Sequence, residues 1–427
     1  MKAIGIDIGT TSICGVVIDI KTGELIKSVT KDSNAFISGV ADWEKIQSVE
    51  KIIAIATEIL DSLITDNVAV IGVTGQMHGI VYVDKYGNAL SPLYTWQDGR
   101  GNQLFEDSTY AEFLGSSTGY GNVTDFYNKQ NDLVPSGAEC FCTIHDYFVM
   151  HLCGLKKPQI HITDAASFGL FDLKSKRFTC DNVIGFVEGY KIAGEYNNIP
   201  VSVAVGDNQA SVLSSISGQD ELLINVGTGS QVSVVCDDII TAHNIETRPF
   251  FENKYIAVGA ALCGGRAYAM LKDFYKAILS SVTEVDDKMV YEIMSAFFEE
   301  KGETLSVDTR FAGTRADKTV RGSIYNISVD NFTPAALTKG VLEGMINELY
   351  DMYKSTGVNI KGIVGSGNGI RKNKALIKAA EKIFGYNLKI PYHTEEAAFG
   401  AALYGMISAG YLRNMYEVGS FIKFIQR

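Results

Sequence analysis

One short motif occurs twice in this chain, near its start and again just past its midpoint. Residues 6–12 read IDIGTTS and residues 224–230 read INVGTGS, each inside a run rich in β-branched residues. Each copy predicts a strand, a tight Gly-Thr turn and a second strand. The predicted strands are residues 3–8 and 13–20 in the first copy, and residues 222–226 and 232–235 in the second. The chain therefore encodes the same local structure twice.

Both turns have the chemistry of a phosphate site. Glycine lets the backbone turn where a Cβ atom would clash, and the free N–H groups and hydroxyls of such a turn can donate to a phosphate chain. A single copy would be read as an ordinary turn of an antiparallel sheet. Because the turn is repeated, we interpret the pair as a clamp for one nucleotide. The predicted phosphate ligands are Gly9, Thr10, Thr11 and Ser12 in the first turn, and Gly227 and Thr228 in the second.

Asp7 stands near the end of the first predicted strand, among apolar residues. A carboxylate at that position has little packing value. It can instead hold a hydrated Mg²⁺ beside a triphosphate, because Mg²⁺ keeps several of its waters and is bound by one or two carboxylates together with phosphates. The sequence therefore predicts Asp7 as a magnesium residue that acts through water.

Length and charge limit the class of protein. A chain of 427 residues with 46% hydrophobic content is expected to form two large domains. We place them at residues 1–214 and 215–427, meeting around residues 214–220 with a ligand cleft between them. The net charge of -11 argues against nucleic acid or an anionic membrane surface as the main partner. A small molecule is the expected ligand.

Targeting signals and cysteine usage predict a cytoplasmic protein. The first predicted strand starts at Ala3, which leaves no room for a signal peptide, and no apolar run reaches the roughly 18 residues of a membrane span. The 7 cysteines are an odd, scattered set, so free thiols are expected. Cys140 and Cys142 lack a second pair or a histidine at metal-ligand spacing, which argues against a zinc site.

The rest of the chain alternates strand-like and helix-like segments, which indicates an α/β fold. The predicted strands are residues 68–74, 80–83, 201–205, 255–261 and 362–364. The predicted helices are residues 43–65, 141–152, 264–279, 334–355, 372–384 and 397–409.

Two polar segments predict a sugar site. Gln76, Met77 and His78 directly follow the strand at residues 68–74, and open α/β sheets bind ligands at strand ends, so Gln76 and His78 can hydrogen-bond a polyol. The alternative is a histidine that is satisfied within its own loop.

The second polar segment holds Trp96, Asp98 and Arg100. A tryptophan face covers the C–H bonds of a sugar, while a carboxylate and a guanidinium bind its hydroxyls. A core tryptophan beside a surface ion pair is the alternative interpretation.

Asp207 lies between an apolar strand and the start of a helix, with Asn208 next to it. An aspartate at that position often only caps the helix. Phosphoryl transfer to a hydroxyl, however, requires a carboxylate within hydrogen-bond reach of the attacking oxygen. We predict that Asp207 is the catalytic base and that Asn208 contacts the substrate.

Residues 363–369 form a strand and a glycine loop before another helix, a layout that lets a base or phosphate approach the backbone. The motif G-x-x-x-x-G-K-[ST] is absent from the sequence. Catalysis would therefore depend on Mg²⁺, backbone donors and helix N-termini. The further residues predicted to bind ATP are Gly265, Gly365, Gly367 and Asn368.

Taken together, these segments resemble the FGGY family of carbohydrate kinases, which is built on the duplicated actin/Hsp70/sugar-kinase fold of ribonuclease H-like type. The resemblance covers about residues 3–409. It implies that residues 7–12 and 226–230 are the two phosphate loops, that residues 365–367 are the adenosine loop, and that Asp207 is the catalytic aspartate.

Within that family, the loop at residues 75–79 is similar to those of ketopentose and heptulose kinases, xylulokinases included. Four other segments look closest to sedoheptulokinases, namely residues 95–100, 143–147, 163–169 and 206–211. The chain departs from the family in being shorter than typical members. Its adenosine loop also carries Ser366 and Asn368 where many relatives have glycine and alanine.

The resemblance implies an ATP- and Mg²⁺-dependent kinase that phosphorylates the terminal primary hydroxyl of a ketose, sedoheptulose first and D-xylulose second. Closure of the domains on the sugar would exclude water that could otherwise be phosphorylated. Two rival classes are a nucleotide-switch protein of the same fold, which needs no sugar loop, and a sugar-sensing regulator, for which no DNA-binding segment is visible. The oligomeric state stays open, with a homodimer as one alternative.

Overall fold

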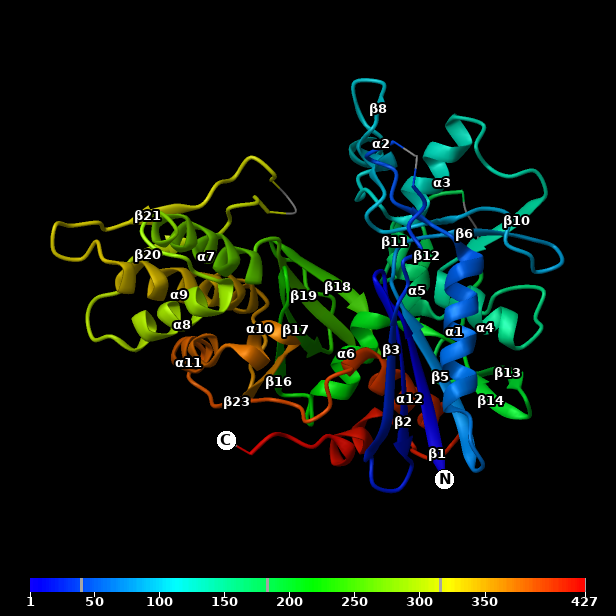
Figure 1. The fold of residues 1–427 in the computed structure, drawn as a ribbon. Helices are drawn as coiled ribbons and strands as arrows, with labels where there is room; N and C mark the ends of the chain where they lie inside the picture. The colour runs from blue at the N-terminus through cyan, green and yellow to red at the C-terminus, as the bar shows by residue number, and fades with distance from the viewer. Residues whose placement is uncertain (39–40, 182–183, 315–316, 427) are drawn as a thin grey trace. The chain divides into compact units, whose positions relative to one another are not determined.

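The computed structural model describes residues 1–38, 41–181, 184–314 and 317–426. The chain forms two compact units, which Figure 1 shows as ribbons. Unit 1 consists of Met1–Ser217, Arg248–Lys254 and Glu395–Ile422. Unit 2 consists of Gly218–Thr247, Tyr255–Thr394 and Lys423–Arg427. Two segments from the second half of the sequence thus belong to unit 1.

Unit 1 is built on a seven-stranded sheet of order β13-β14-β5-β1-β2-β3, in which the short strand β15 also pairs with β5. β1 is antiparallel to β2 and parallel to β5, and β15 is parallel to β5 as well. The strands are β1 (Lys2–Ile8), β2 (Ser12–Asp19), β3 (Leu25–Asp32), β5 (Val68–Gly75), β13 (Ile192–Tyr196), β14 (Ile199–Ser202) and β15 (Val205–Gly206).

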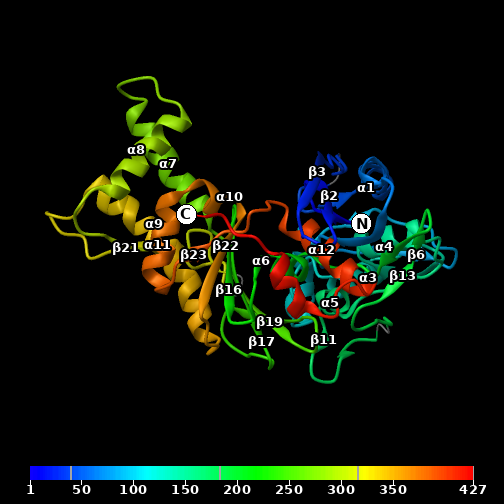
Figure 2. The same cartoon turned by 90° about the horizontal axis from the view of Figure 1, so that it is seen from below.

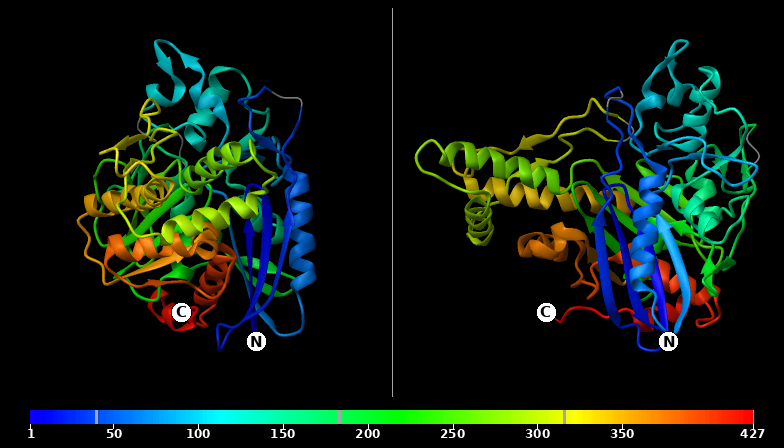
Figure 3. Two further views of the ribbon diagram at one scale, coloured as in Figure 1. Left: turned by 60° about the vertical axis from the view of Figure 1, so that its left-hand side comes forward. Right: turned by 45° about the vertical axis from the view of Figure 1, so that its right-hand side comes forward.

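Helices α1 (Val49–Leu63) and α12 (Glu396–Ser408) cover opposite faces of this sheet. Alternate residues of a strand point to opposite faces. A Cβ atom at Gly15 would meet Ile59 of α1, whereas one at Gly5 would lie 1.9 Å from the carbonyl oxygen of Ala398 in α12. Figure 3 shows α1 running along the strands β1 to β3. The glycine at position 5 is therefore what allows α12 to lie directly on the sheet.

Smaller elements complete unit 1. Its short strand pairs are β4 (Ile46–Gln47) with β7 (Leu93–Tyr94), β6 (Val81–Asp84) with β10 (Ala138–Cys142), β8 (Leu104–Phe105) with β9 (Ser108–Thr109), and β11 (Phe171–Asp172) with β12 (Arg177–Phe178). Its other helices are η1 (Gly99–Asn102), α2 (Tyr110–Phe113), α3 (Gly121–Gln130), α4 (Ile144–Leu152), α5 (Ile162–Ser167), α6 (Asp207–Ser215) and η2 (Met415–Phe421).

Unit 2 repeats the sheet plan with the order β18-β19-β17-β16-β22-β23. β16 is antiparallel to β17 and parallel to β22, as β1 is to β2 and β5 in unit 1. The strands are β16 (Glu221–Val226), β17 (Ser230–Cys236), β18 (Ile245–Pro249), β19 (Tyr255–Ala261), β22 (Gly362–Ser366) and β23 (Leu388–Lys389), and β20 (Ser306–Asp308) pairs with β21 (Ser323–Tyr325).

The helices of unit 2 pack around its long helix α9, which contacts β17, β19, α7, α8 and α11. Figure 2 shows this group from below. The helices are α7 (Gly265–Leu279), α8 (Asp287–Glu299), α9 (Pro334–Ser355), α10 (Gly367–Lys372) and α11 (Lys374–Phe384). Among the described residues, no helix is long and apolar enough to cross a bilayer.

The predicted α/β fold and both predicted hairpins are confirmed, and the boundaries of two helices were wrong. The helix predicted over residues 43–65 begins only at Val49, because the Ser48 side chain caps it and Ile46–Gln47 pairs with β7 as β4. The helix predicted over residues 141–152 begins at Ile144, since the residues before it belong to β10.

Two smaller boundary predictions also differ from the structure. The strand predicted over residues 201–205 is divided between β14 and β15. The helix predicted from residue 372 is interrupted at Asn373, whose side chain accepts hydrogen bonds from the first N–H groups of α11.

Candidate active site

The carboxyl ends of β1, β5 and β15 bring two aspartates to one edge of the unit 1 sheet. Asp7 on β1 lies opposite Thr74 of β5, and Thr74 donates a 2.6 Å hydrogen bond to the carbonyl of Val205 in β15. Asp207 follows β15 as the first residue of α6. Because these strands are parallel, Asp7 and Asp207 share the edge at which open α/β sheets bind ligands.

Both carboxyl groups are perturbed by their surroundings. Burial raises the pKa of Asp7 to about 8, and the nearby charges of Asp207 and Glu395 raise it further. Burial also raises the pKa of Asp207, while His145 and Arg248 act in the opposite direction. Burial lowers the pKa of His145 itself, which favours the neutral imidazole, so the Arg248 guanidinium is the cation that favours the charged form of Asp207. The residues that perturb Asp7 are acidic.

The environment of Asp7 fits a divalent cation. Its Oδ1 atom is buried and has no hydrogen-bond partner among the described residues. A buried carboxylate oxygen without a partner is costly unless a proton or a cation compensates it. Hard cations such as Mg²⁺ bind oxygen ligands, so the donor set suits the magnesium role that the sequence predicts for Asp7.

A buried acidic cluster adjoins Asp207. His145 Nε2 lies 3.0 Å from Asp164 Oδ1, and both side chains are fully buried. Asp146 lies beside them and accepts a 2.7 Å hydrogen bond from the Thr143 hydroxyl. Burial and the Asp207 charge raise the pKa of Asp164.

Sequence reasoning gave no role to His145, Asp146 and Asp164, nor to Arg248. The signals in the sequence were a pair of polar residues at the start of an apolar helix, at positions 145–146, and the resemblance of residues 143–147 and 163–169 to sedoheptulokinases. The titratable neighbours of Asp207 are therefore more numerous than the roles predicted from the sequence.

The loop after β5 is folded onto the rest of unit 1. The Met77 side chain is buried, and a Cβ at Gly206 would lie 2.6 Å from its sulfur. His78 Nδ1 lies 2.7 Å from the carbonyl oxygen of Ser167, and its ring stacks on Tyr120 at 4.2 Å. The imidazole is therefore oriented by the protein before any ligand binds.

The structure brings residues of two predicted sites together. The indole nitrogen of Trp96 donates to the Thr10 hydroxyl at 2.9 Å. That hydroxyl donates in turn to Gln76 Oε1 at 3.2 Å. Trp96 remains 45% exposed, so its ring can still cover a ligand. A residue of the first Gly-Thr turn thus contacts two residues that were predicted to bind the sugar.

Asp98 and Arg100 are bound to protein groups. Arg100 Nη1 lies 2.6 Å from Asp98 Oδ2, Arg100 Nη2 lies 2.9 Å from Glu44, and the guanidinium stacks over Tyr94 at 4.3 Å. Asp98 also accepts from the backbone N–H of Lys45. The pair is buried and not on the surface, and it fixes the loop that carries Trp96. Contact of Asp98 and Arg100 with a sugar stays a prediction.

The second Gly-Thr turn meets the N-terminus of α7. Gly265 N donates to the Gly227 carbonyl at 2.9 Å, and Arg266 N donates to the Thr228 carbonyl at 3.0 Å. A Cβ at Gly265 would lie 2.5 Å from the Gly227 oxygen, so only glycine allows this approach. Gly227 and Thr228 are exposed, which leaves the turn accessible to a ligand.

The glycine loop after β22 lies against the same hairpin. Gly367 has a φ of +80°, and a Cβ there would lie 2.6 Å from the Val226 carbonyl. Asn225 Nδ2 donates to the Ser366 hydroxyl at 2.8 Å. A Cβ at Gly365 would meet Ile370 and Leu388, which gives that glycine a packing role, and Asn368 is exposed.

The remaining predicted residues lie at the unit 1 turn and at α6. Gly9, Thr10 and Ser12 are partly exposed and Thr11 is exposed. The side-chain oxygen of Asn208 lies 3.5 Å from Arg248 Nη1.

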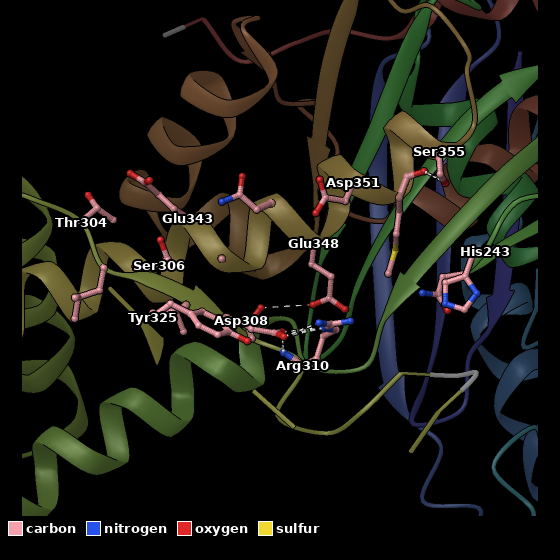
Figure 4. Close-up of a pocket in the computed structure, with 18 residues that line it drawn as sticks. His243, Thr304, Ser306, Asp308, Arg310, Tyr325, Glu343, Glu348, Asp351 and Ser355 are labelled. Carbon is pink, nitrogen blue, oxygen red and sulfur yellow. Dashed lines mark hydrogen bonds and ion pairs between the residues drawn. The ribbon is translucent and has the colours of Figure 1, made fainter. Parts of the chain in front are cut away.

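A separate pocket of about 630 Å³ lies in unit 2 between α9 and the β20–β21 pair (Figure 4). None of the site residues predicted from the sequence lines it. Arg310 binds Asp308, with Nη2 2.6 Å from Oδ2, and Glu348 of α9 projects toward this pair. Burial and the Asp308 charge raise the pKa of Glu348 to about 7.

The structure is a duplicated α/β fold with a Gly-Thr turn in each half, and the comparisons with known proteins identify its family. Residues 2–185 match the N-terminal domain of the FGGY family of carbohydrate kinases, and residues 222–409 match its C-terminal domain. The chain therefore belongs to the FGGY family. It is a carbohydrate kinase, a class that uses ATP as its phosphoryl donor.

Named relatives agree with this assignment. The chain is 28% identical to sedoheptulokinase of Mus musculus, with 94% of this chain and 96% of the relative covered. It is 25% identical to xylulose kinase of Staphylococcus xylosus, with 97% and 92% covered. The fold matches the crystal structure of xylulose kinase from Rhodospirillum rubrum with a TM-score of 0.85 at 16% identity, covering 100% of this chain and 93% of that one.

Proposed function

We propose that this enzyme transfers the γ-phosphoryl group of ATP to the terminal primary hydroxyl of a ketose, with sedoheptulose as the first candidate. The observation that carries the proposal is the position of Asp207, which lies with Asp7 at the ligand-binding edge of the sheet and near the Arg248 guanidinium. The similarity to sedoheptulokinase over nearly the whole chain supports the heptulose. D-xylulose is the second candidate, because xylulose kinases also match almost the full length.

Asp207 would orient the sugar hydroxyl and accept its proton. In a loose phosphoryl-transfer transition state the proton leaves late, so orientation of the hydroxyl contributes as much as basicity. A charged carboxylate is needed for both tasks. The Arg248 guanidinium favours that form, which offsets part of the effect of burial on the Asp207 pKa.

Asp7 would hold Mg²⁺ through water. When bound, the ion neutralises charge on the phosphate oxygens during transfer. The buried, unpartnered Oδ1 atom of Asp7 supports this role. The ion would also compensate the acidic surroundings that raise the Asp7 pKa.

The phosphates would be bound by Gly9, Thr10, Thr11 and Ser12 of unit 1 and by Gly227 and Thr228 of unit 2. The start of α7 at Gly265 would add the positive end of a helix dipole. Residues 365–368 would receive the adenosine. A glycerol kinase of Plasmodium falciparum with the same fold was solved with ADP, which supports a nucleotide in this fold. The proposal requires that the two turns bind one ATP molecule.

The sugar would contact Gln76, Met77, His78, Asn208 and the exposed face of Trp96. The fixed ring of His78 supplies a directed hydrogen-bonding group. An aromatic face and a few convergent polar groups are typical of sites that bind a polyol.

The test is a substrate panel. The purified enzyme is incubated with ATP, Mg²⁺ and sedoheptulose, D-xylulose, D-ribulose, D-fructose or glycerol while ADP release is followed. We expect the highest kcat/KM with sedoheptulose and negligible ADP release without sugar. A preference for D-xylulose would select the second candidate. Sugar-independent hydrolysis would favour a nucleotide switch, and sugar binding without ADP release would favour a sensor.

A further inference from the structure

A closed circuit of hydrogen bonds joins the first Gly-Thr turn to the predicted sugar residues. Trp96 Nε1 donates to the Thr10 hydroxyl at 2.9 Å, and that hydroxyl donates to Gln76 Oε1 at 3.2 Å. Gln76 Nε2 donates to Gln47 Oε1 at 3.0 Å. Gln47 Nε2 donates back to the Thr10 carbonyl at 2.7 Å. Gln47 was not among the site residues predicted from the sequence.

The order of donors and acceptors in this circuit is forced. The Thr10 carbonyl can only accept, so Gln47 must present its amide nitrogen to that carbonyl and its oxygen to Gln76. Gln76 therefore presents its amide nitrogen to Gln47 and its oxygen to the Thr10 hydroxyl, which must use its single proton as the donor. The same hydroxyl accepts from the indole N–H of Trp96. Reversal of either amide would place like groups of Gln47 and Gln76 together and break the bond between them.

Rigid backbone holds the members of the circuit. Gln47 is fully buried on β4 and lies opposite Leu93 of β7, the strand that leads to Trp96. The backbone N–H of Gln76 donates to the Ile8 carbonyl at the end of β1. A buried amide that loses its hydrogen-bond partners keeps the free-energy cost of desolvation with no compensating bond, so displacing one residue of the circuit perturbs the others.

The circuit restricts what the Thr10 hydroxyl can bind. While its proton is given to Gln76, it has none to donate to a phosphate oxygen. A ligand that takes over the Gln76 oxygen would release that proton. Trp96, at the exposed end of the circuit, and Gln76 are the residues that a sugar is proposed to reach.

We propose that Gln47 is a positioning residue that couples the sugar site to the first phosphate loop, so that Thr10 engages a nucleotide phosphate fully only when a sugar occupies Gln76 and Trp96. This inference rests on the proposed function of these residues. It provides a reason for the enzyme to bind ATP productively only with its sugar. By linkage, the sugar and the nucleotide must strengthen each other's binding by the same factor.

Binding measurements on Gln47→Leu test the coupling. The dissociation constant of AMPPNP is measured by calorimetry with and without saturating sedoheptulose, and that of sedoheptulose with and without AMPPNP. In the wild type we expect a factor of about 5 or more in both directions. In Gln47→Leu the factor by which each ligand strengthens binding of the other should fall below about 2, which corresponds to loss of the coupling.

The matched control is Gln103→Leu. Gln103 is a partly buried glutamine of unit 1 whose amide, like that of Gln47, donates to a backbone carbonyl, here that of Gly99, but it lies outside the circuit. It should keep the wild-type factor. A factor near 1 in the wild type, or an unchanged factor in Gln47→Leu, would overturn the inference. Failure of the proposed function is a different result, namely no turnover of any ketose by the wild type.

A spectroscopic readout does not depend on affinity or turnover. The chain has 2 tryptophans, so Trp43→Phe leaves Trp96 as the only indole. In this background we expect Trp96 emission to respond to AMPPNP only when sedoheptulose is present. Adding Gln47→Leu should make nucleotide alone sufficient. If Gln47→Leu does not fold, two substitutions of Thr10 provide the same contrast. Thr10→Ser keeps the hydroxyl and Thr10→Val removes it. Equal fluorescence responses of the two variants would contradict the coupling.

Discussion

The two Gly-Thr turns share a backbone plan but differ in the side chains that surround them. Asp7 and Asn225 occupy equivalent positions, since each lies near the end of the strand before its turn. Their partners on the neighbouring parallel strand are Thr74 and Ser366. In unit 2 the amide of Asn225 donates to the Ser366 hydroxyl. In unit 1 the Thr74 hydroxyl is used to hold β15, and Asp7 keeps an unpartnered oxygen.

This difference shows how one local fold can serve two chemical tasks. The unit 1 copy concentrates buried carboxyl groups, with Asp7, Asp146, Asp164 and Asp207 all shifted toward higher pKa by burial. The unit 2 copy offers backbone N–H groups, a neutral amide and the start of α7. The first arrangement suits a cation and a proton acceptor, and the second suits an anionic nucleotide.

The largest effect is expected for Asp207→Asn, which removes the proposed base from the group of carboxyl residues in unit 1. We expect kcat to fall about 10³-fold, because a positioned proton acceptor contributes roughly 10²–10⁴-fold. AMPPNP binding should change little, since the nucleotide is assigned to other residues. Steady-state ADP release and calorimetry measure the two quantities. Asp66→Asn, an exposed aspartate of unit 1, is the control, and full turnover by Asp207→Asn would remove the residue from this role.

An exchange of the two equivalent residues is expected to have the next largest effect. Asp7→Asn gives the first copy the amide of the second, and we expect kcat to fall about 10²-fold with a higher Mg²⁺ requirement. Asn225→Asp places a charge in the second copy and should raise the KM for ATP about 10-fold through like-charge repulsion. Kinetics at varied Mg²⁺ and ATP distinguish the two. Equal effects of the two variants on both parameters would refute the proposed division of tasks.

Local sequence predicted the hairpins because their pattern is short and self-contained. β-branched runs around a Gly-Thr turn specify both strands without help from distant residues, and the same residues carried the resemblance to the FGGY family. The start of α1 was missed because Ile46–Gln47 pairs with β7, which is distant in the sequence. Such long-range pairing leaves no local sequence pattern.

Long-range contacts also limited what could be predicted of the site. Arg248 lies in the second half of the sequence, yet it belongs to unit 1 and acts on Asp207. His145 lies on α4 and Asp164 on α5, and the two side chains meet only in the folded unit 1. Gln47 reads as an ordinary polar residue before a helix, and its importance appears only when its two partners are known.

The smallest effect concerns a buried carboxyl group of unit 2 that lies in the separate pocket and not at the Gly-Thr turn. Glu348 has its pKa raised to about 7 by burial and by Asp308, against the opposing effects of Arg310 and Thr309. Its folded pKa exceeds the unfolded value of about 4.5, so its stabilising effect is complete below pH 4.5 and is lost as pH rises through 7.

Glu348→Gln should remove this pH dependence of stability and leave the carboxyl groups of unit 1 unchanged. We expect the variant to unfold about 2–4 °C above the wild type at pH 8, with little difference in shape of the transition, because a change near 1 kcal/mol shifts Tm by that amount in a domain of this size. Thermal unfolding followed by circular dichroism from pH 4.5 to 8 measures it. Asn347→Ala alters the same pocket without changing charge and should keep the wild-type slope. If the pH profile of Glu348→Gln ran parallel to that of the wild type, the Glu348 carboxyl would ionise freely. The perturbed carboxyl groups that matter for stability would then lie in unit 1 alone.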